Sequence, residues 1–236
     1  MLKKIIRVSA FTLAETLIVM GIVGIIAALT LPNLNQSTNN KEKVTKLQKI
    51  YSNLNDALGR AQAVYGPFDE WFEKDNDDTA KVNRFASRLN DFTKLTKDCG
   101  ITSNASCWNS TIPTYSNTSN GRTVQLADGT SLYFFKPQVT YGHIWVDVDG
   151  PNKGGNHAQL DQFLFVVENN EIVPYGNSTN TSTARLGCLS GAKSKNYYSD
   201  NYCTKWVIDN GNMDYLKCPD ALYGNGSPSN SNVTCN

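Results

Sequence analysis

Apolar residues in the first third of the chain follow two successive patterns, and the first is a continuous run. It covers residues 11–31 and contains one charged residue, Glu15. Because a helix rises about 1.5 Å per residue, a helical run of this length would cover about 30 Å, the thickness of the hydrocarbon core of a bilayer. The run therefore predicts a transmembrane helix over residues 11–32.

A second, amphipathic pattern follows Pro32. Apolar residues recur there at steps of three and four, which is typical of a helix with one apolar face. The positions are Val44, Leu47, Tyr51, Leu54, Leu58, Ala61 and Tyr65, and the basic residues Lys41, Lys43, Lys46, Lys49 and Arg60 are interpreted as a solvated face. Gly66 and Pro67 form a stop signal. Since a proline can kink a membrane helix without ending it, we predict one helix of about 55 residues, with its amphipathic half over residues 33–66.

The remaining chain, residues 67–236, is predicted to be globular. Residues 82–95 have helical spacing and predict a short helix, and the stretch that follows, residues 99–120, is polar and rich in turns. Strands are predicted at residues 123–126, 131–135, 143–148, 163–167 and 172–174, with hairpin turns at Asp128-Gly129 and Asn169-Asn170. Residues 176–236 are rich in turn-forming residues and predict loops.

Together these elements predict the α+β class. An antiparallel sheet commonly has one apolar face, and the apolar stripe of the long helix needs a surface to cover it. The expected arrangement is the long N-terminal helix packed on an antiparallel sheet of four or five strands, followed by a loop-rich C-terminal region.

Six cysteines lie in the globular part: Cys99, Cys107, Cys188, Cys203, Cys218 and Cys235. None forms a C-x-x-C motif and the chain has two histidines, so the spacing does not favour zinc. An even number of cysteines in an exported, loop-rich domain favours disulfides that staple the C-terminal region. Many connectivities are open, and the working hypothesis pairs sequence neighbours: Cys99 with Cys107, Cys188 with Cys203, and Cys218 with Cys235.

The distribution of charge also predicts the orientation of the chain in the membrane. The net charge is +1 and no basic stripe accompanies the aromatic residues, so nucleic acid is not an expected partner. Lys3, Lys4 and Arg7 precede the apolar run and would stay in the cytoplasm, with the rest of the chain outside.

A secretory signal that is cut near Ala27 and Ala28 would begin with the same basic residues and apolar run. The run is long for such a signal, and an acidic residue within it costs up to about 2.5–3.5 kcal/mol at mid-membrane.

The segment SAFTLAE at residues 9–15 resembles the class III signal of type IV prepilins and type II secretion pseudopilins. The match extends through the apolar run to Pro32, and Ala10 stands where the family usually has glycine. The resemblance implies a leader over residues 1–10, cleavage by prepilin peptidase between Ala10 and Phe11, and methylation of Phe11. It also implies a pilin-like fold, a bacterial inner-membrane location with the C-terminal domain outside the cytoplasm, and polymerisation with other pilin or pseudopilin subunits.

Glu15 has two interpretations that can coexist. Residues 12–15, TLAE, fit the capping box, in which the glutamate satisfies the start of a helix. The resemblance implies a second role, in which the carboxylate binds the N-terminal amine of a neighbouring subunit and sets the register of assembly, in a setting of low dielectric. We favour the assembly role.

The most ligand-like cluster is the acidic loop that starts at Asp147. Asp147, Asp149 and Asp161 carry oxygens of the kind that Ca²⁺ prefers, but the spacing is not that of an EF-hand. An Asx/Gly turn between strands is the favoured interpretation, so no metal or other cofactor is expected. No G-x-S-x-G, P-loop or H-E-x-x-H motif occurs, and the chain is not expected to be an enzyme.

The sequence thus predicts a structural subunit of a type IV pilus or type II secretion pseudopilus, assembled through its N-terminal helix. Two other functions remain open. One is a minor tip pilin or adhesin-type binding module, and the other is a Sec-cleaved periplasmic protein.

Overall fold

The computed structural model divides into two compact units, Met1–Asn40 and Lys41–Asn236. The residues that it describes are 12–72, 77–101, 107–109, 121–135, 137–153, 160–175, 203–213 and 216, with the side chains of residues 30–37 excepted.

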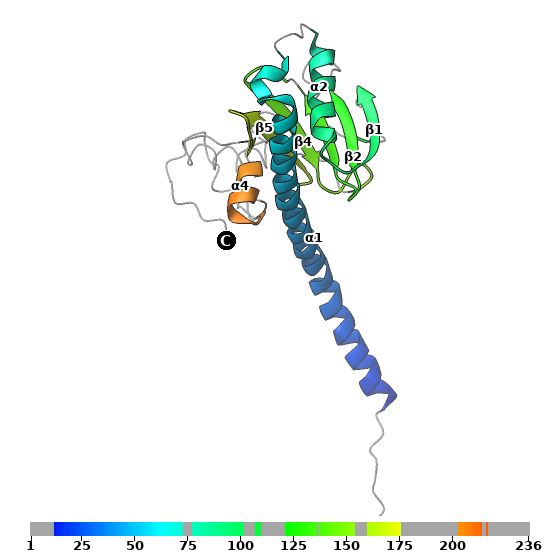
Figure 1. Cartoon of the computed structure of the whole chain (residues 1–236). Helices are drawn as coiled ribbons and strands as arrows, with labels where there is room; N and C mark the ends of the chain where they lie inside the picture. Colours follow the sequence, from blue (N-terminus) through cyan, green and yellow to red (C-terminus); the bar gives the residue numbers. More distant parts are fainter. Residues whose placement is uncertain are drawn as a thin grey trace, which may run out of the picture. The chain divides into compact units, whose positions relative to one another are not determined.

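The first element is the helix α1, Leu13–Tyr65, which is 53 residues long (Figure 1). It confirms the prediction of one continuous long helix. The helix ends at Gly66, whose φ of 82° is a left-handed conformation that glycine adopts at little cost. The Gly66 N–H donates to the Gln62 carbonyl at 3.0 Å, and Pro67 follows, which lacks the N–H needed to continue the ladder.

The other described elements all lie in the unit Lys41–Asn236. They are the 3-10 helix η1 (Phe68–Phe72), the helices α2 (Asp78–Asn90) and α4 (Cys203–Asn210), and the strands β1 (Leu95–Ile101), β2 (Arg122–Leu126), β3 (Ser131–Phe135), β4 (Tyr141–Asp147), β5 (Gln162–Glu168) and β6 (Glu171–Pro174). The six strands form one sheet in chain order, and each pairs with its neighbour antiparallel. The α+β class with an antiparallel sheet is confirmed.

Both predicted hairpins are present, and their turn residues explain why. β2 and β3 are joined through Asp128 and Gly129, where Gly129 has a φ of 87°. β5 and β6 are joined through Asn169 and Asn170, whose φ values are 51° and 64°. Two successive positive φ angles match the right-handed twist of the flanking strands, and asparagine tolerates them better than most residues.

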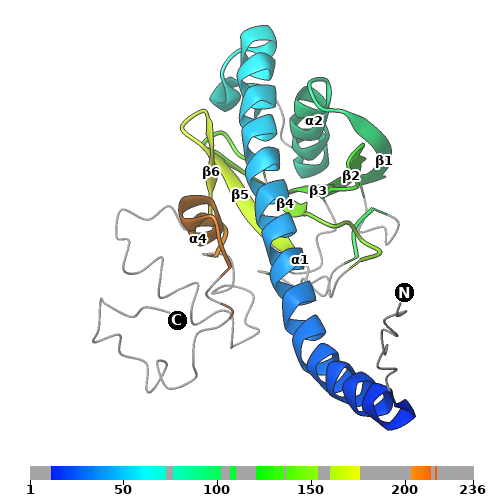
Figure 2. The ribbon, with the colours of Figure 1, turned by 90° about the horizontal axis from the view of Figure 1, so that it is seen from below.

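The core lies between one face of the sheet and the apolar stripe of α1. The buried residues of the stripe are Val44, Leu47, Ile50, Leu54, Ala57, Leu58 and Ala61. Half-buried Tyr51 stacks on Phe165 of β5 with ring centroids 5.4 Å apart. Figure 2 shows this part of α1 lying across the sheet, with α2 beside it. The expected burial of the stripe against the sheet is confirmed, whereas Tyr65 at the end of α1 is exposed.

Strand β1 was not predicted, and it raises the sheet from five strands to six. It is polar and largely exposed along its length, so it has no apolar alternation that could reveal it. Among the described strands, β1 lies at the edge of the sheet and pairs only with β2, through backbone groups, and the pairing has two irregularities. α2 spans Asp78–Asn90 rather than residues 82–95 as predicted, because the Asp77 side chain caps an earlier start and Leu95 belongs to β1.

Helix α4 lies in the part of the chain that was predicted to be loops, so that prediction is wrong for residues 203–210. Cys203 and Val207, one helical turn apart, are both buried in the core. The helix ends at Gly211, which has a φ of 63° and donates its N–H to the Val207 carbonyl. The turn signal at this glycine is present in the sequence, but a helix of two turns has too few residues to show periodicity.

Candidate functional site

The first candidate site is the apolar part of α1 at residues 13–29, here called the assembly segment. Its large apolar side chains are between 53% and 81% exposed. They are Leu13, Leu17, Ile18, Val19, Met20, Ile22, Val23, Ile25, Ile26 and Leu29. The surface of a soluble monomer rarely shows so many apolar residues together.

Glu15 closes the start of this helix as the capping box predicts. The N–H and the hydroxyl of Thr12 each donate to Glu15 Oε2 at 2.9 Å, and the Glu15 N–H donates to Thr12 Oγ1 at 3.3 Å. Side chains thus satisfy two backbone N–H groups at the helix start. The capping role is confirmed, and the intermolecular role of Glu15 stays a prediction.

The predicted processing site, between Ala10 and Phe11, lies outside the described residues. In the part of the chain that the structure describes, no helix combines the length and the apolar character needed to cross a bilayer. Phe11 and the side chains of residues 30–37 also lie outside the described set, so the transmembrane helix over residues 11–32 stays a prediction.

The second candidate site is the acidic loop that follows β4. Asp147 is fully buried, and both of its carboxylate oxygens accept hydrogen bonds. Oδ1 accepts from the Gly150 N–H at 2.8 Å, and Oδ2 accepts from Gln162 Nε2 at 3.1 Å. Gly150 has a φ of 82°, and a Cβ there would lie 2.5 Å from the Gly129 carbonyl oxygen. The predicted Asx/Gly turn is therefore confirmed, with glycine required at position 150.

Two lysines of α1 bind this loop. Lys43 is buried and its Nζ lies 3.1 Å from Asp149 Oδ2, and Lys46 Nζ donates to the Val148 carbonyl at 3.0 Å. The interpretation of the basic residues as a solvated face is wrong for these two, although Lys41 and Lys49 are exposed. Lys43 and Lys46 flank the apolar stripe on the helix surface, where a long side chain can reach the adjacent sheet loop.

The surroundings of the acidic loop shift the pKa of Asp147 strongly. Burial raises the pKa of Asp147, the nearby Asp161 and Asp149 charges raise it further, and the bonds from Gln162 and Gly150 lower it; the resulting pKa is about 7. A raised pKa of this kind can mark a functional site, but a buried structural carboxyl shows it as well.

The three carboxylates do not assemble into a recognisable metal centre. In the described ranges, no three side chains of His, Cys, Asp and Glu form a group that could hold a metal ion. Lys43 instead places an ammonium group beside Asp149. Calcium binding by Asp147, Asp149 and Asp161 was the less favoured alternative, and this arrangement does not test it.

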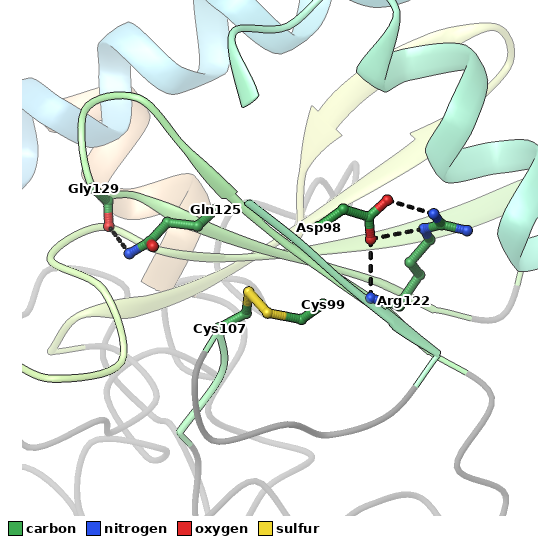
Figure 3. Close-up of a disulfide and its surroundings, with 7 residues drawn as sticks. Asp98, Cys99, Cys107, Arg122, Gln125 and Gly129 are labelled. Carbon is green, nitrogen blue, oxygen red and sulfur yellow. Dashed lines mark hydrogen bonds and ion pairs between the residues drawn. A yellow bond between two sulfur atoms is a disulfide. The ribbon is translucent and has the colours of Figure 1, made fainter. Parts of the chain in front are cut away.

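One predicted disulfide is confirmed. Cys99 and Cys107 are bonded to each other (Figure 3). Cys203 is also in a disulfide, and the cysteines with which it could pair, Cys188, Cys218 and Cys235, lie outside the described residues. The pairs Cys188 with Cys203 and Cys218 with Cys235 stay predictions.

Sequence reasoning missed a cluster of polar residues that anchors β1 next to the disulfide. The Asp98 carboxylate accepts from Arg122 Nε at 3.2 Å and also from Arg122 Nη2 (Figure 3). Arg122 Nη1 donates to Asn83 of α2. Burial acts to raise the pKa of Asp98, but the Arg122 and Gly100 hydrogen bonds outweigh it and lower the pKa. The three residues are far apart in sequence, so no local motif could have indicated the cluster.

The comparisons with known proteins place the chain in a family. No curated protein and no solved structure matches it. One protein family does match, over residues 33–217, which begins just after the apolar run and covers more than half of the 236 residues. The chain therefore belongs to the family of unknown function DUF6613.

Proposed function

We propose that this chain is a structural subunit of a filament of the type IV pilus or type II secretion pseudopilus class. The observation that carries the proposal is the contrast along α1. The assembly segment exposes its apolar residues, whereas the stripe from Val44 to Ala61 of the same helix is buried in the folded domain. The C-terminal part of the helix thus belongs to the core of the domain, whereas the assembly segment is available to lipid or to a neighbouring subunit.

The energetics of the assembly segment favour a lipid or protein environment. Burying a large apolar side chain stabilises by roughly 1.5–3 kcal/mol, and ten such side chains lie in residues 13–29. A bilayer can take up this surface before assembly, and the helices of neighbouring subunits can take it up afterwards. We infer that the segment is first an inner-membrane anchor and then part of a filament core.

Small residues on the assembly segment suit close packing between helices. Gly24 and Ala28 are four residues apart, and a Cβ built on Gly21 or Gly24 would meet nothing within 4 Å. Small residues at this spacing let helix backbones approach closely in an apolar medium. The described contacts leave this face of the helix open for a neighbour.

Glu15 gives the assembly a polar anchor point. Its bonds from Thr12 both end on Oε2, so the carboxylate is held at the helix start. A carboxylate in an apolar medium gains most from a cationic partner, and cleavage after Ala10 would create an amine on Phe11. The partners of this proposal are prepilin peptidase, other pilin or pseudopilin subunits and the inner membrane, with the C-terminal domain outside the cytoplasm.

The experiment compares the full chain with two single variants in the producing bacterium. Glu15→Ala removes the proposed anchor point, and Glu42→Ala removes an exposed carboxylate from the same helix as a matched control. Mass spectrometry reads the N-terminus of the membrane-extracted protein, and sheared filaments are assayed for the chain. We expect all three proteins to start at a methylated Phe11, and we expect Glu15→Ala alone to be lost from the filaments.

The N-terminus also separates the alternatives. A chain that retains Met1, or one that starts near Ala28, contradicts the proposal, and the second result identifies a secreted periplasmic protein instead. Correct processing with equal filament incorporation of all three proteins removes Glu15 from the assembly mechanism.

A further inference from the structure

The face of the sheet that points away from α1 carries two rows of side chains across the strands. Register places Gln125, Ser131, Asp147 and Gln162 side by side on β2, β3, β4 and β5 as a polar row. The next row is apolar and contains Tyr133, Trp145 and Leu164, which form a small cluster separate from the main core. Trp145 and Leu164 are almost fully buried although α1 lies on the other face of the sheet.

A short segment, residues 107–109, packs on the apolar row through Trp108 and contacts Gln162 of the polar row through Asn109, and it is here called the cap. The Trp108 ring is 5.6 Å from the Tyr133 ring and is itself 5% exposed. The Asn109 carbonyl accepts from Gln162 Nε2 at 3.0 Å, and Asn109 Nδ2 donates to the Pro151 carbonyl at 3.3 Å. Burial raises the pKa of Tyr133 to about 12, as expected for a phenol shielded from water.

A covalent bond attaches the cap to the edge of the sheet. Cys107, the first residue of the cap, is fully buried and bonded to Cys99 of β1. Beside Cys99, Asp98 is tied through Arg122 to β2 and α2, so the anchor itself is held in place. A bond of this kind raises the effective concentration of the cap next to the sheet face, and it removes conformational freedom from the open state.

We propose that the Cys99–Cys107 disulfide is a redox-controlled latch that closes the cap over the outer face of the sheet. When the bond forms, the two thiols lose two protons and pass two electrons to the disulfide of an oxidant, which is itself reduced to a dithiol. A dithiol reductant reverses the reaction and frees the cap, which exposes Trp145 and the polar row to water. The domain therefore reaches its closed form in an oxidising compartment.

The latch is distinct from the proposed filament function, because it uses no residue of the assembly segment. It also differs from a simple loop staple. A staple would stabilise the chain without changing the exposure of the outer face, whereas a latch couples the redox state of Cys99 and Cys107 to the burial of Trp145.

Hydroxyl-radical footprinting of the full chain tests this coupling, since peptide mass spectrometry reports the oxidation of single side chains. The oxidised protein is compared with the double variant Cys99→Ser/Cys107→Ser. We expect the oxidation of Trp145 and Tyr133 to rise several-fold in the variant. Phe165, which is buried on the α1 face, serves as the internal control and is expected to stay protected. Unchanged oxidation of Trp145 alongside a protected Phe165 overturns the proposal.

A second variant decides the case in which the double variant does not fold. Trp108→Ala keeps both cysteines, and coupling is reciprocal, so a weakened cap must make the disulfide easier to reduce. Alkylation of Cys99 and Cys107 at graded dithiothreitol concentrations measures this. We expect the reduction equilibrium to shift roughly two- to tenfold, the effect of one aromatic contact. An equilibrium identical to that of the wild type overturns the latch.

Discussion

At the scale of single residues, the buried carboxyl of Asp147 shows how far tertiary surroundings can move a group from its usual behaviour. An aspartate in an unfolded chain has a pKa of about 3.9. In the folded domain, burial and the nearby Asp161 and Asp149 charges raise the pKa of Asp147 to about 7. At a pH between these two pKa values, Asp147 holds a proton in the folded state and releases it in the unfolded state.

This difference sets a pH dependence of stability. Because the folded pKa lies above the unfolded one, the contribution of Asp147 is complete below about pH 4 and is lost as the pH rises to about 7. We expect the free energy of unfolding to fall over this window in the wild type, and to fall less steeply in Asp147→Asn. Urea denaturation of the full chain at a series of pH values measures both slopes. Equal slopes in the two proteins would contradict the assigned pKa.

At the scale of elements, close packing between η1, α2 and the sheet depends on a residue without a side chain. Gly142 lies on β4 and faces the core, where a Cβ would meet the rings of Phe68 and Phe85 at 3.0–3.1 Å. Those two rings are buried and pack edge-to-face with each other, with centroids 5.4 Å apart. The aromatic layer can therefore approach β4 only because position 142 is glycine.

The variant Gly142→Ala tests this approach. We expect it to lower the free energy of unfolding by about 1–3 kcal/mol, because buried rings on two elements must shift to admit one methyl group. Gly59→Ala is the matched control. Gly59 lies on the exposed face of α1 with nothing near its Cβ, so alanine there is expected to stabilise by up to about 1 kcal/mol. Thermal melts compare the two, and a neutral Gly142→Ala would contradict the packing argument.

At the scale of the whole domain, the buried ion pair of Lys43 and Asp149 joins α1 to the β4–β5 connection. The two side chains are 9% and 17% exposed, and the residues are far apart in sequence. Removing one member of a buried pair leaves the other charge without its partner, which costs more than an exposed pair would. Asp149 Oδ1 already lacks a hydrogen-bond partner among the described residues, so it has little to replace the lysine.

Accordingly, Lys43→Met is expected to destabilise the domain by about 2 kcal/mol or more. Lys49→Met, at an exposed position of the same helix, is expected to leave stability almost unchanged. The double variant Lys43→Met/Asp149→Asn should recover part of the loss, which a double-mutant cycle from chemical denaturation would quantify. Equal effects of Lys43→Met and Lys49→Met would show that the pair contributes nothing.

Much of the fold was predictable because local patterns carry it. The hairpin at Asn169 and Asn170 and the end of α1 at Gly66 depend on residues that tolerate positive φ. The capping box at Glu15 depends on a three-residue spacing. Elements whose stability comes from distant partners were missed. β1 is held by its backbone pairing with β2, and α4 by the contact of Val207 with the core.

The amino-acid sequence by itself determined the long helix, the α+β class and the β2–β3 and β5–β6 hairpins, because each depends on neighbours within a few residues or on a strong periodicity. Only the tertiary structure decided that Lys43 and Lys46 face the acidic loop, that Asp147 is buried with a raised pKa, and that Trp108 packs with Tyr133, Trp145 and Leu164 on the outer sheet face. These properties arise where segments from different parts of the chain meet, and burial there, rather than residue type, sets the chemistry.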